Sequence, residues 1–260
     1  MVMVSGSFNV KLWGAVAAHF VCAPLLFFAH AGGSSGDSPK VAVIYTITNP
    51  KLKEDVERAV RDEFGGKVEI LRYEDASIFE ETAKAGRMGR EPAAKFVAMY
   101  ADSVRSGARA VLSVCSTVSD LAHSMRETGE FVGVPIVGMN DEMCREAVRS
   151  GDRILVAATF RSAVEPTKRS IRRACAELGR SVEISEAVVD GGFGSASGAF
   201  EKLLSEKLRE AAKSADVIVF AQASMAPYAD FVERACAKRV LSNPKFGARA
   251  LKSALAGEGR

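Results

Sequence analysis

From Lys40 onward, short apolar runs alternate with stretches in which apolar residues recur about every 3.6 positions. Continuous apolar runs predict strands covered on both faces, and the 3.6-residue period predicts amphipathic helices. The predicted strands are Val41–Thr46, Val68–Tyr73, Ala108–Val114, Pro135–Met139, Ile154–Ala158, Val182–Val189, Val217–Ala221 and Val240–Leu241. The predicted helices are Leu52–Phe64, Ala93–Arg105, Thr117–Arg126, Glu142–Arg149, Val164–Leu178, Ala199–Ala212, Tyr228–Ala237 and Phe246–Leu255. Strict alternation of this kind predicts parallel sheets joined by right-handed crossovers.

Eight such units could build a (β/α)8 barrel, but only about 220 residues follow Lys40, near the low end for that fold. The two halves also resemble each other, because each has a strand that ends in a small polar cluster opening a helix. These clusters are Val114–Thr117 and Ala221–Ser224. We therefore predict an α/β protein of two pseudosymmetric, doubly wound (flavodoxin- or Rossmann-like) lobes with parallel sheets and a cleft between them. Lobe one would span residues 39–151, lobe two residues 152–237, and a C-terminal helix within 238–260 would pack back on lobe one.

The first 38 residues have a different pattern. Lys11 precedes the apolar stretch Leu12–Ala29, and small residues with a Gly/Ser-rich run follow it, which is the layout of a secretory signal. The stretch has about the length of a membrane span, although Pro24 interrupts it. Residues 1–31 thus predict export or anchoring, with membrane contact only through residues 12–29. The alternative is a misassigned start before a cytoplasmic core.

Composition narrows the classes of function. The chain has 260 residues, 48% apolar and 26% charged, with a formal charge of +3, which fits a globular protein with a sizeable core. There is no basic stripe with interleaved aromatic residues, so nucleic-acid binding has no support. The five cysteines include no CxxC pair, and with three histidines they make no zinc-type cluster. We therefore expect reduced thiols and no metal.

Cys115 is the strongest catalytic candidate, because of its position between two predicted elements. The apolar run Val111–Val114 precedes it and a polar run follows it, with Ser116 or Thr117 as the predicted N-cap of a helix. Ligands of open α/β sheets bind at the carboxyl ends of strands. The positive end of a helix would favour a thiolate, and equally a substrate carboxylate. A buried structural cysteine is the alternative interpretation.

Polar side chains that follow the predicted strands are candidates for substrate contacts. A capping or loop role is the alternative for each of them, because Ser, Thr and Asn favour such positions. The candidates are Thr46, Thr48, Asn49, Ser116, Thr117, Thr159, Gln222 and Ser224.

Other titratable residues are weaker candidates. His123 follows Cys115 by eight residues, about 12 Å along a helix, so it cannot reach the thiol directly. Tyr228 and Asp230 could reach a cleft but also fit the start of a helix. The Gly-rich segment Asp190–Gly198 matches neither the GxxxxGK[ST] nor the GxGxxG spacing of phosphate-binding loops. We expect it to be a flexible connection that could act as a lid.

Several of these segments resemble motifs of the aspartate/glutamate/hydantoin racemase superfamily, in order and spacing from Val41 to Leu255. Ser113-Val114-Cys115-Ser116-Thr117 is similar to the family's first cysteine motif, and Asp216–Met225 falls where the second belongs. The resemblance implies an active site between two lobes, no cofactor, and two cysteines on opposite faces of the substrate. One thiolate removes the proton next to a carboxylate and the opposing thiol returns one. The family also suggests a homodimer.

Gln222 stands at the second cysteine position, and glutamine is neither acid nor base near neutral pH. The expectation is a cofactor-independent, racemase-family enzyme that acts at the carbon α to a carboxylate of a small amino or carboxylic acid. Cys115 would accept and donate the proton. The alternatives are a one-cysteine decarboxylase or isomerase, or a non-catalytic carboxylate-binding protein on the same scaffold.

Overall fold

The computed structural model describes residues 38–189 and 197–257. The apolar stretch Leu12–Ala29 and most of the Gly-rich connection after Val189 lie outside these residues, as do Cys22 and the first two histidines. Within the described ranges, no helix is both long enough and apolar enough to span a membrane.

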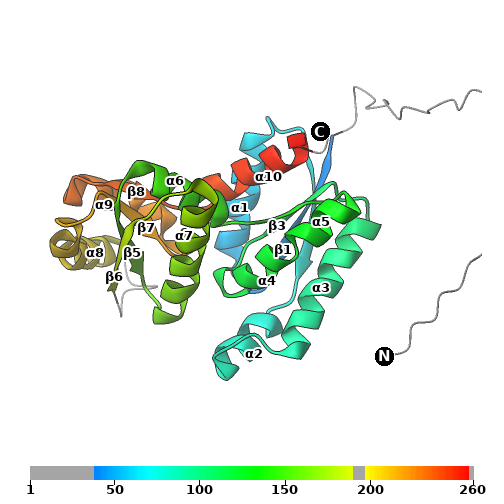
Figure 1. The fold of residues 1–260 in the computed structure, drawn as a ribbon, viewed down its shortest axis with the longest axis horizontal. Coiled ribbons are helices and arrows are strands. Elements are labelled where there is room, and N and C mark those ends of the chain that lie inside the picture. The colour runs from blue at the N-terminus through cyan, green and yellow to red at the C-terminus, as the bar shows by residue number, and fades with distance from the viewer. Residues whose placement is uncertain (1–37, 190–196, 258–260) are drawn as a thin grey trace, which may run out of the picture. The chain divides into compact units, whose positions relative to one another are not determined.

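The first sheet has four parallel strands in the order β2-β1-β3-β4, and Figure 1 labels its two central strands, β1 and β3. These strands are β1 (Lys40–Tyr45), β2 (Glu69–Glu74), β3 (Ala110–Ser113) and β4 (Ile136–Gly138). Every residue of β3 and all but the first of β1 are buried, as expected for strands covered on both faces.

The second sheet repeats this plan with the order β6-β5-β7-β8. Its strands are β5 (Arg153–Ala158), β6 (Glu183–Val188), β7 (Val217–Phe220) and β8 (Arg239–Leu241). In each sheet the chain winds outward from the first strand in one direction and then returns to wind in the other. The switch points lie between β1 and β3 and between β5 and β7. The predicted α/β class with two doubly wound lobes and parallel sheets is confirmed.

Helices cover both faces of each sheet. The helices are α1 (Pro50–Glu63), α2 (Ser77–Ala85), α3 (Arg90–Arg105), α4 (Ser119–Ser124), α5 (Arg126–Val132), α6 (Asp141–Ser150), α7 (Val164–Leu178), α8 (Ser197–Ala212), α9 (Ala229–Cys236) and α10 (Lys245–Gly257). Three 3-10 turns are η1 (Ser116–Val118), η2 (Arg161–Ala163) and η3 (Ala223–Tyr228). One core of the first sheet contains Phe96 of α3, and the other contains Val60 of α1 with Leu251 of α10. The second sheet packs against α6 and α7 on one face and α8 and α9 on the other.

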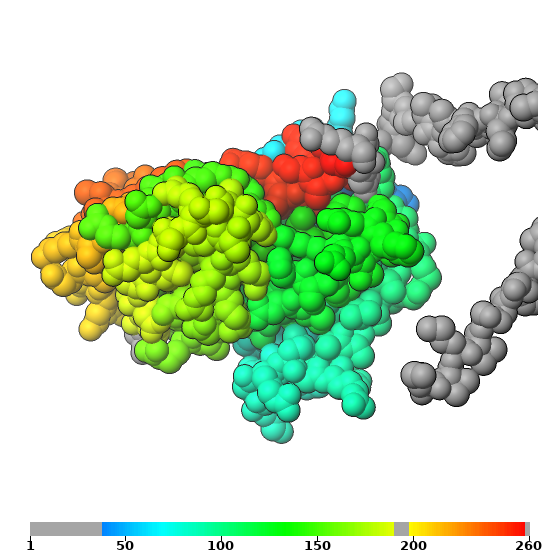
Figure 2. Space-filling model, in the orientation of Figure 1, coloured from blue at the N-terminus to red at the C-terminus, as the bar shows by residue number. Residues whose placement is uncertain are grey.

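Three elements near the expected lobe bounds of 39–151, 152–237 and 238–260 show which sheet they pack with. Helix α6 contributes Met143 and Cys144 to the core of the second sheet, and β8 pairs with β7. Helix α10 packs against α1, β3 and β4 of the first sheet, and Figure 2 shows its red surface lying against green residues of the first half of the chain. On this packing we assign residues 38–140 with α10 to lobe one and residues 141–241 to lobe two. The chain crosses between them at residues 139–140 and 242–244, the two crossover segments.

Two helical predictions need correction. Helix α2 was not predicted, because only Ile78 and Thr82 of its nine residues are buried and the apolar period is weak. The predicted continuous helix Thr117–Arg126 is instead the turn η1 followed by the short helices α4 and α5. Neither Ser116 nor Thr117 is an N-cap. Cys115 itself precedes η1, without a side-chain cap.

Candidate active site

A cavity of about 360 Å³ lies where the carboxyl ends of both sheets meet. Segments that follow β1, β3, β4, β5 and β7 contribute to it, so both topological switch points open into one space, as expected for ligand sites of open α/β sheets. Its lining residues are Ile47, Asn49, Leu52, Phe79, Val114, Cys115, Ser116, Thr117, Met139, Asn140, Phe160, Ser162, Ala163, Ala221, Gln222, Ala223 and Ser224.

Cys115 lines this cavity directly after β3. Its backbone is extended (φ −97°, ψ 129°), and the preceding residue Val114 still donates to Ile44 of β1 through its backbone N–H (3.1 Å). The chain turns only afterwards, where Val118 N donates to Cys115 O (3.3 Å). The thiol is partly exposed and not in a disulfide. The sheet therefore holds Cys115 at the cavity through its own hydrogen bonds. Because η1 and the six-residue α4 follow, the expected support from a long helix N-terminus is absent here.

Gln222 occupies the equivalent place in lobe two, between β7 and η3, again with an extended backbone (φ −130°, ψ 134°). Its Oε1 accepts hydrogen bonds from the backbone N–H groups of Thr159 (2.7 Å) and Phe160 (3.3 Å), and its Nε2 donates to Thr159 Oγ1 (2.8 Å). The amide thus ties the loop after β5 to the loop after β7. Gln222 therefore stabilises the wall of the cavity, and most of its hydrogen-bonding groups are bound to other residues of the protein.

The structure gathers six of the residues singled out from the sequence around the cavity: Cys115, Asn49, Ser116, Thr117, Gln222 and Ser224. Asn49 is also the N-cap of α1, since its Oδ1 accepts from Leu52 N (3.0 Å).

Three other candidates do not line the cavity. Thr46 is fully buried, and its Oγ1 has no hydrogen-bond partner among the described residues. Thr48 donates to Glu74 Oε1 (3.1 Å). Thr159 is buried behind Gln222. The chain bends at Thr46 and Ile47 directly after β1, and of these two residues only Ile47 lines the cavity.

Sequence reasoning missed Ser162 and Asn140, together with the apolar residues of the wall. Ser162 lies in η2, after β5, where the Thr159 loop was recognised but not its continuation. Asn140 is buried in the first crossover segment and accepts through Oδ1 from Asn243 Nδ2 in the second. The hydrogen bond joins the two places where the chain passes between lobes. Asn243 is remote in sequence, so only the folded chain reveals this pair.

The other three thiols that the structure describes lie away from the cavity. Cys144 is fully buried in α6, and desolvation raises the pKa of its thiol far above the ordinary range. Burial also raises the pKa values of Cys175 and Cys236. Of the cysteines that the structure describes, only Cys115 lines the cavity.

His123, Tyr228 and Asp230 do not line the cavity either. His123 is half-buried near Arg126 and Arg173, and desolvation with these two positive charges lowers its pKa. Tyr228 packs edge-on against Phe200 with ring centroids 4.9 Å apart. Asp230 is exposed on α9.

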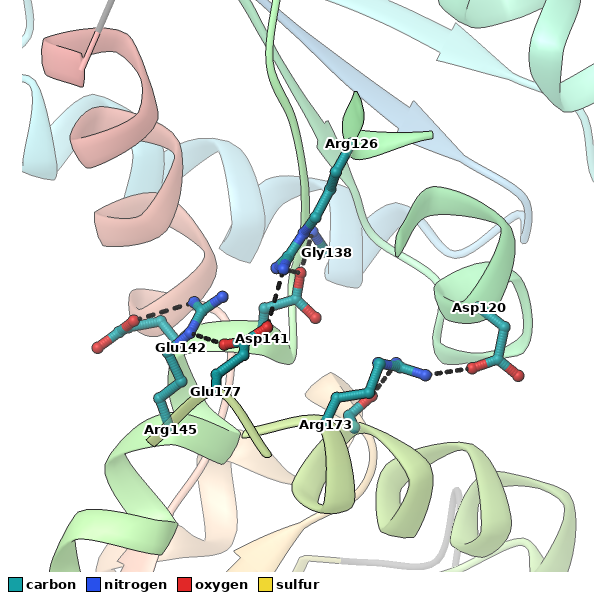
Figure 3. A network of polar contacts seen from close by, with 9 residues as sticks. Asp120, Arg126, Gly138, Asp141, Glu142, Arg145, Arg173 and Glu177 are labelled. Atoms are coloured by element: carbon teal, nitrogen blue, oxygen red, sulfur yellow. Dashed lines mark hydrogen bonds and ion pairs between the residues drawn. The ribbon is translucent and has the colours of Figure 1, made fainter. Parts of the chain in front are cut away.

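Charged side chains join the lobes on another part of their interface (Figure 3). Asp120 of α4 accepts from Arg169 (2.8 Å) and Arg173 (2.6 Å) of α7. Arg126 of α5 donates to Glu177 of α7 (3.0 Å) and to Asp141 (2.8 Å). Arg145 also donates to Glu177 (2.7 Å). We call these seven residues the ion-pair network: Asp120, Arg126, Asp141, Arg145, Arg169, Arg173 and Glu177.

In residues 38–189 and 197–257, no group of three His, Cys, Asp or Glu side chains could hold a metal ion. The polar groups of the cavity are a thiol, hydroxyls and amides.

A two-lobed α/β scaffold with a thiol at the carboxyl ends of paired parallel sheets defines the class of this protein. The sequence matches the family described as Asp/Glu/Hydantoin racemase over residues 41–251. The chain belongs to this family, as the resemblance predicted, and it is therefore a racemase-type enzyme of the isomerase class. A search of the curated proteins finds no match.

Solved racemase structures share the fold. An allantoin racemase from Klebsiella pneumoniae has a TM-score of 0.61 and 17% identity, covering 84% of this chain and 88% of that one. A glutamate racemase from Bacillus anthracis has a TM-score of 0.62 and 14% identity, covering 85% and 83%. An aspartate racemase from Picrophilus torridus has a TM-score of 0.56 and 13% identity, covering 85% and 94%. At these identities the likeness concerns the fold.

Proposed function

We propose that this racemase-family enzyme moves a proton at the carbon next to the carboxylate of a small amino or carboxylic acid, with Cys115 as the single proton carrier. The observation that supports this most is the contrast between the two equivalent strand ends. The one after β3 presents a thiol to the cavity, whereas the one after β7 presents an amide bound to Thr159 and Phe160.

The proton balance follows from this contrast. The Cys115 thiolate takes the proton from the α carbon, and the electron pair left on carbon is delocalised into the carboxyl group. Hydroxyls of Ser116, Thr117 and Ser224 are close enough to the cavity to hold that group. The thiol exchanges this proton with solvent and then returns one to the same face of the carbon, which restores the thiolate. Exchange with solvent therefore proceeds with retention of configuration, unless a second proton carrier takes part.

Deuterium exchange tests the proposal. Single enantiomers of amino acids, small carboxylic acids and hydantoins are incubated with the enzyme in heavy water, and α-deuterium is followed by NMR. Wild-type protein should exchange at least one substrate, and Cys115→Ala should lose the activity. Cys175→Ala is the matched control, since Cys175 lies on α7 outside the cavity. Exchange that survives Cys115→Ala would overturn the role of this thiol.

Binding without exchange would favour a carboxylate-binding protein instead. Release of carbon dioxide from a malonate-type diacid would favour the decarboxylase alternative, because that reaction needs protonation from only one face. Both outcomes can be measured in the same incubations.

Gln222→Cys tests the single-carrier mechanism by adding a second proton carrier. A second thiol at this position should let the proton return to the opposite face, so that optical rotation decays together with exchange. Gln222→Ser is the control, because it loses the same hydrogen bonds without adding a thiol. Wild-type racemisation as fast as exchange would contradict the single-carrier mechanism.

A further inference from the structure

The cavity contains no charged side chain among its described lining residues. Its polar groups are the Cys115 thiol, the hydroxyls of Ser and Thr residues, and the amides of Asn49, Asn140 and Gln222. Each of these amides has its carbonyl oxygen bound to the protein: Asn49 by Leu52 N, Asn140 by Asn243, and Gln222 by the loop after β5. The groups left for a ligand are therefore the hydroxyls, the thiol and amide N–H donors, and Asn140 Nδ2 is buried with no partner among the described residues. These groups are all neutral, and they are enough to hold one carboxylate.

Several bulky apolar lining residues follow the strands on the β2 side of Cys115, although Met139 lies on the β4 side. In the strand order β2-β1-β3-β4, Phe79 follows β2, Ile47 and Leu52 follow β1, and Cys115 follows β3. Phe160, from the loop after β5, adds a second aromatic ring from lobe two. A hydrocarbon substituent would bury its surface against this wall, and the cavity of about 360 Å³ is within the range of small-molecule sites.

Cations beside the cavity are already paired with carboxylates. Lys53, next to Leu52, binds Glu74 (2.7 Å). Arg161, between Phe160 and Ser162, binds Glu186 (3.2 Å). A second carboxylate on the substrate would have to leave water without gaining an opposite charge, which is strongly unfavourable.

We infer that the cavity selects substrates whose acidic carbon carries an uncharged, mostly hydrocarbon substituent, and that it discriminates against acids with a side-chain carboxylate. This inference rests on the proposed function and specifies its substrate class. The wall formed by Ile47, Leu52, Phe79 and Phe160 determines the specificity.

Matched pairs of acids test the inference. Methionine and glutamate, and norvaline and aspartate, are compared as single enantiomers in the heavy-water assay, and their binding is measured by calorimetry. We expect the uncharged member of each pair to exchange at least tenfold faster at equal low concentration and to bind correspondingly tighter. Faster exchange or tighter binding of glutamate or aspartate would overturn the inference while leaving the proposed function intact.

The two claims can fail separately. If no acid exchanges but methionine and norvaline bind tighter than their acidic partners, the substrate class stands and the catalytic proposal fails. If no acid binds, both fail.

Phe79→Lys supplies the missing charge and should reverse the preference, raising exchange or binding of glutamate relative to methionine at least tenfold. Ala85→Lys is the matched control, because it adds the same charge to an exposed position of the same helix α2. An equal effect of both substitutions would show that overall charge, and not the wall, sets the preference, and would overturn the inference.

Discussion

The two lobes meet through two chemically opposite regions. Around the cavity the described lining side chains are apolar or neutral. The ion-pair network instead pairs charged side chains in two groups, both partly drawn in Figure 3. In one group Asp120 binds Arg169 and Arg173. In the other, Arg126 and Arg145 bind Glu177, and Arg126 also binds Asp141. Charges at the interface are thus compensated by other protein charges. The cavity keeps its hydroxyls and thiol for a ligand. Separation of this kind lets ion pairs join the lobes without placing a charged side chain at the cavity.

Among the predicted changes, removal of the Cys115 thiol from the uncharged cavity should have the largest effect, and the effect should be on activity. Cys115→Ala should reduce deuterium exchange about 100-fold or more, the usual contribution of a positioned acid–base group, while the midpoint of urea unfolding stays nearly unchanged because Cys115 is only partly buried. Exchange rates and unfolding curves are measured on the same preparation. A large loss of stability would mean that Cys115 serves packing instead.

Arg126→Met should destabilise the protein by disrupting the ion-pair network. Asp141 is buried, and its carboxylate is bound by Arg126 (2.8 Å) and by the backbone N–H of Gly138 (2.9 Å). Loss of the arginine leaves a buried charge poorly compensated and should lower the free energy of unfolding by about 2–4 kcal/mol. Arg105→Met removes an exposed ion pair with Asp102 and should cost less than about 1 kcal/mol. Equal losses of unfolding free energy in the two variants would show that the network stabilises the fold no more than an exposed ion pair does.

Gln222→Leu tests the neutral region without touching a charge. The backbone N–H of Thr159 would lose its acceptor at 2.7 Å, so we expect a loss of about 1–3 kcal/mol. This loss should be independent of pH between about 4 and 8, because no titratable group is removed. Urea unfolding at several pH values gives the result, and a strong pH dependence would refute it.

The stability that the ion-pair network contributes should fall at acid pH, and this effect should be smaller than those of the three substitutions above. Burial acts to raise the pKa of Glu177, but hydrogen bonds and positive charge from Arg145 and Arg126 outweigh it and hold that pKa below its ordinary value. A carboxyl with a lowered folded-state pKa stabilises the fold above its unfolded-state pKa, and this stabilisation disappears as pH falls through the folded-state value. Glu177→Gln should therefore flatten the acid side of the stability profile, below about pH 4.5, by less than about 1 kcal/mol. An unchanged acid slope would show that the network contributes no pH dependence.

Much of the fold could be predicted because burial imposes a simple pattern on parallel strands. All eight strands occur within a few residues of their predicted bounds, since β1, β3, β5 and β7 are covered on both faces and must be apolar throughout. Helix α2 and the division of Thr117–Arg126 into η1, α4 and α5 could not be predicted, because only two side chains of α2 are buried and short helices depend on tertiary contacts.

The candidate site divides in the same way. Cys115 and Gln222 were found because each follows a strand at an equivalent place in its half of the chain. Thr46 and Thr159 were misjudged as cavity residues, because the direction of a side chain after a strand depends on how the next loop turns. Ser162 was missed for the same reason, whereas Phe79 was missed because it lies on the unpredicted helix α2.

By itself, the sequence determined the two parallel-sheet lobes, the family and the thiol at the end of β3, because local periodicity and motif order are written along the chain. Only the tertiary structure decided that Gln222 is bound to the loop after β5 and that Asn140 meets Asn243. It also decided that no charged side chain is among the described residues that line the cavity, and that the ion-pair network lies elsewhere on the same interface. These properties arise from residues that are distant in sequence, and their energies depend on which partners the fold brings within hydrogen-bonding distance.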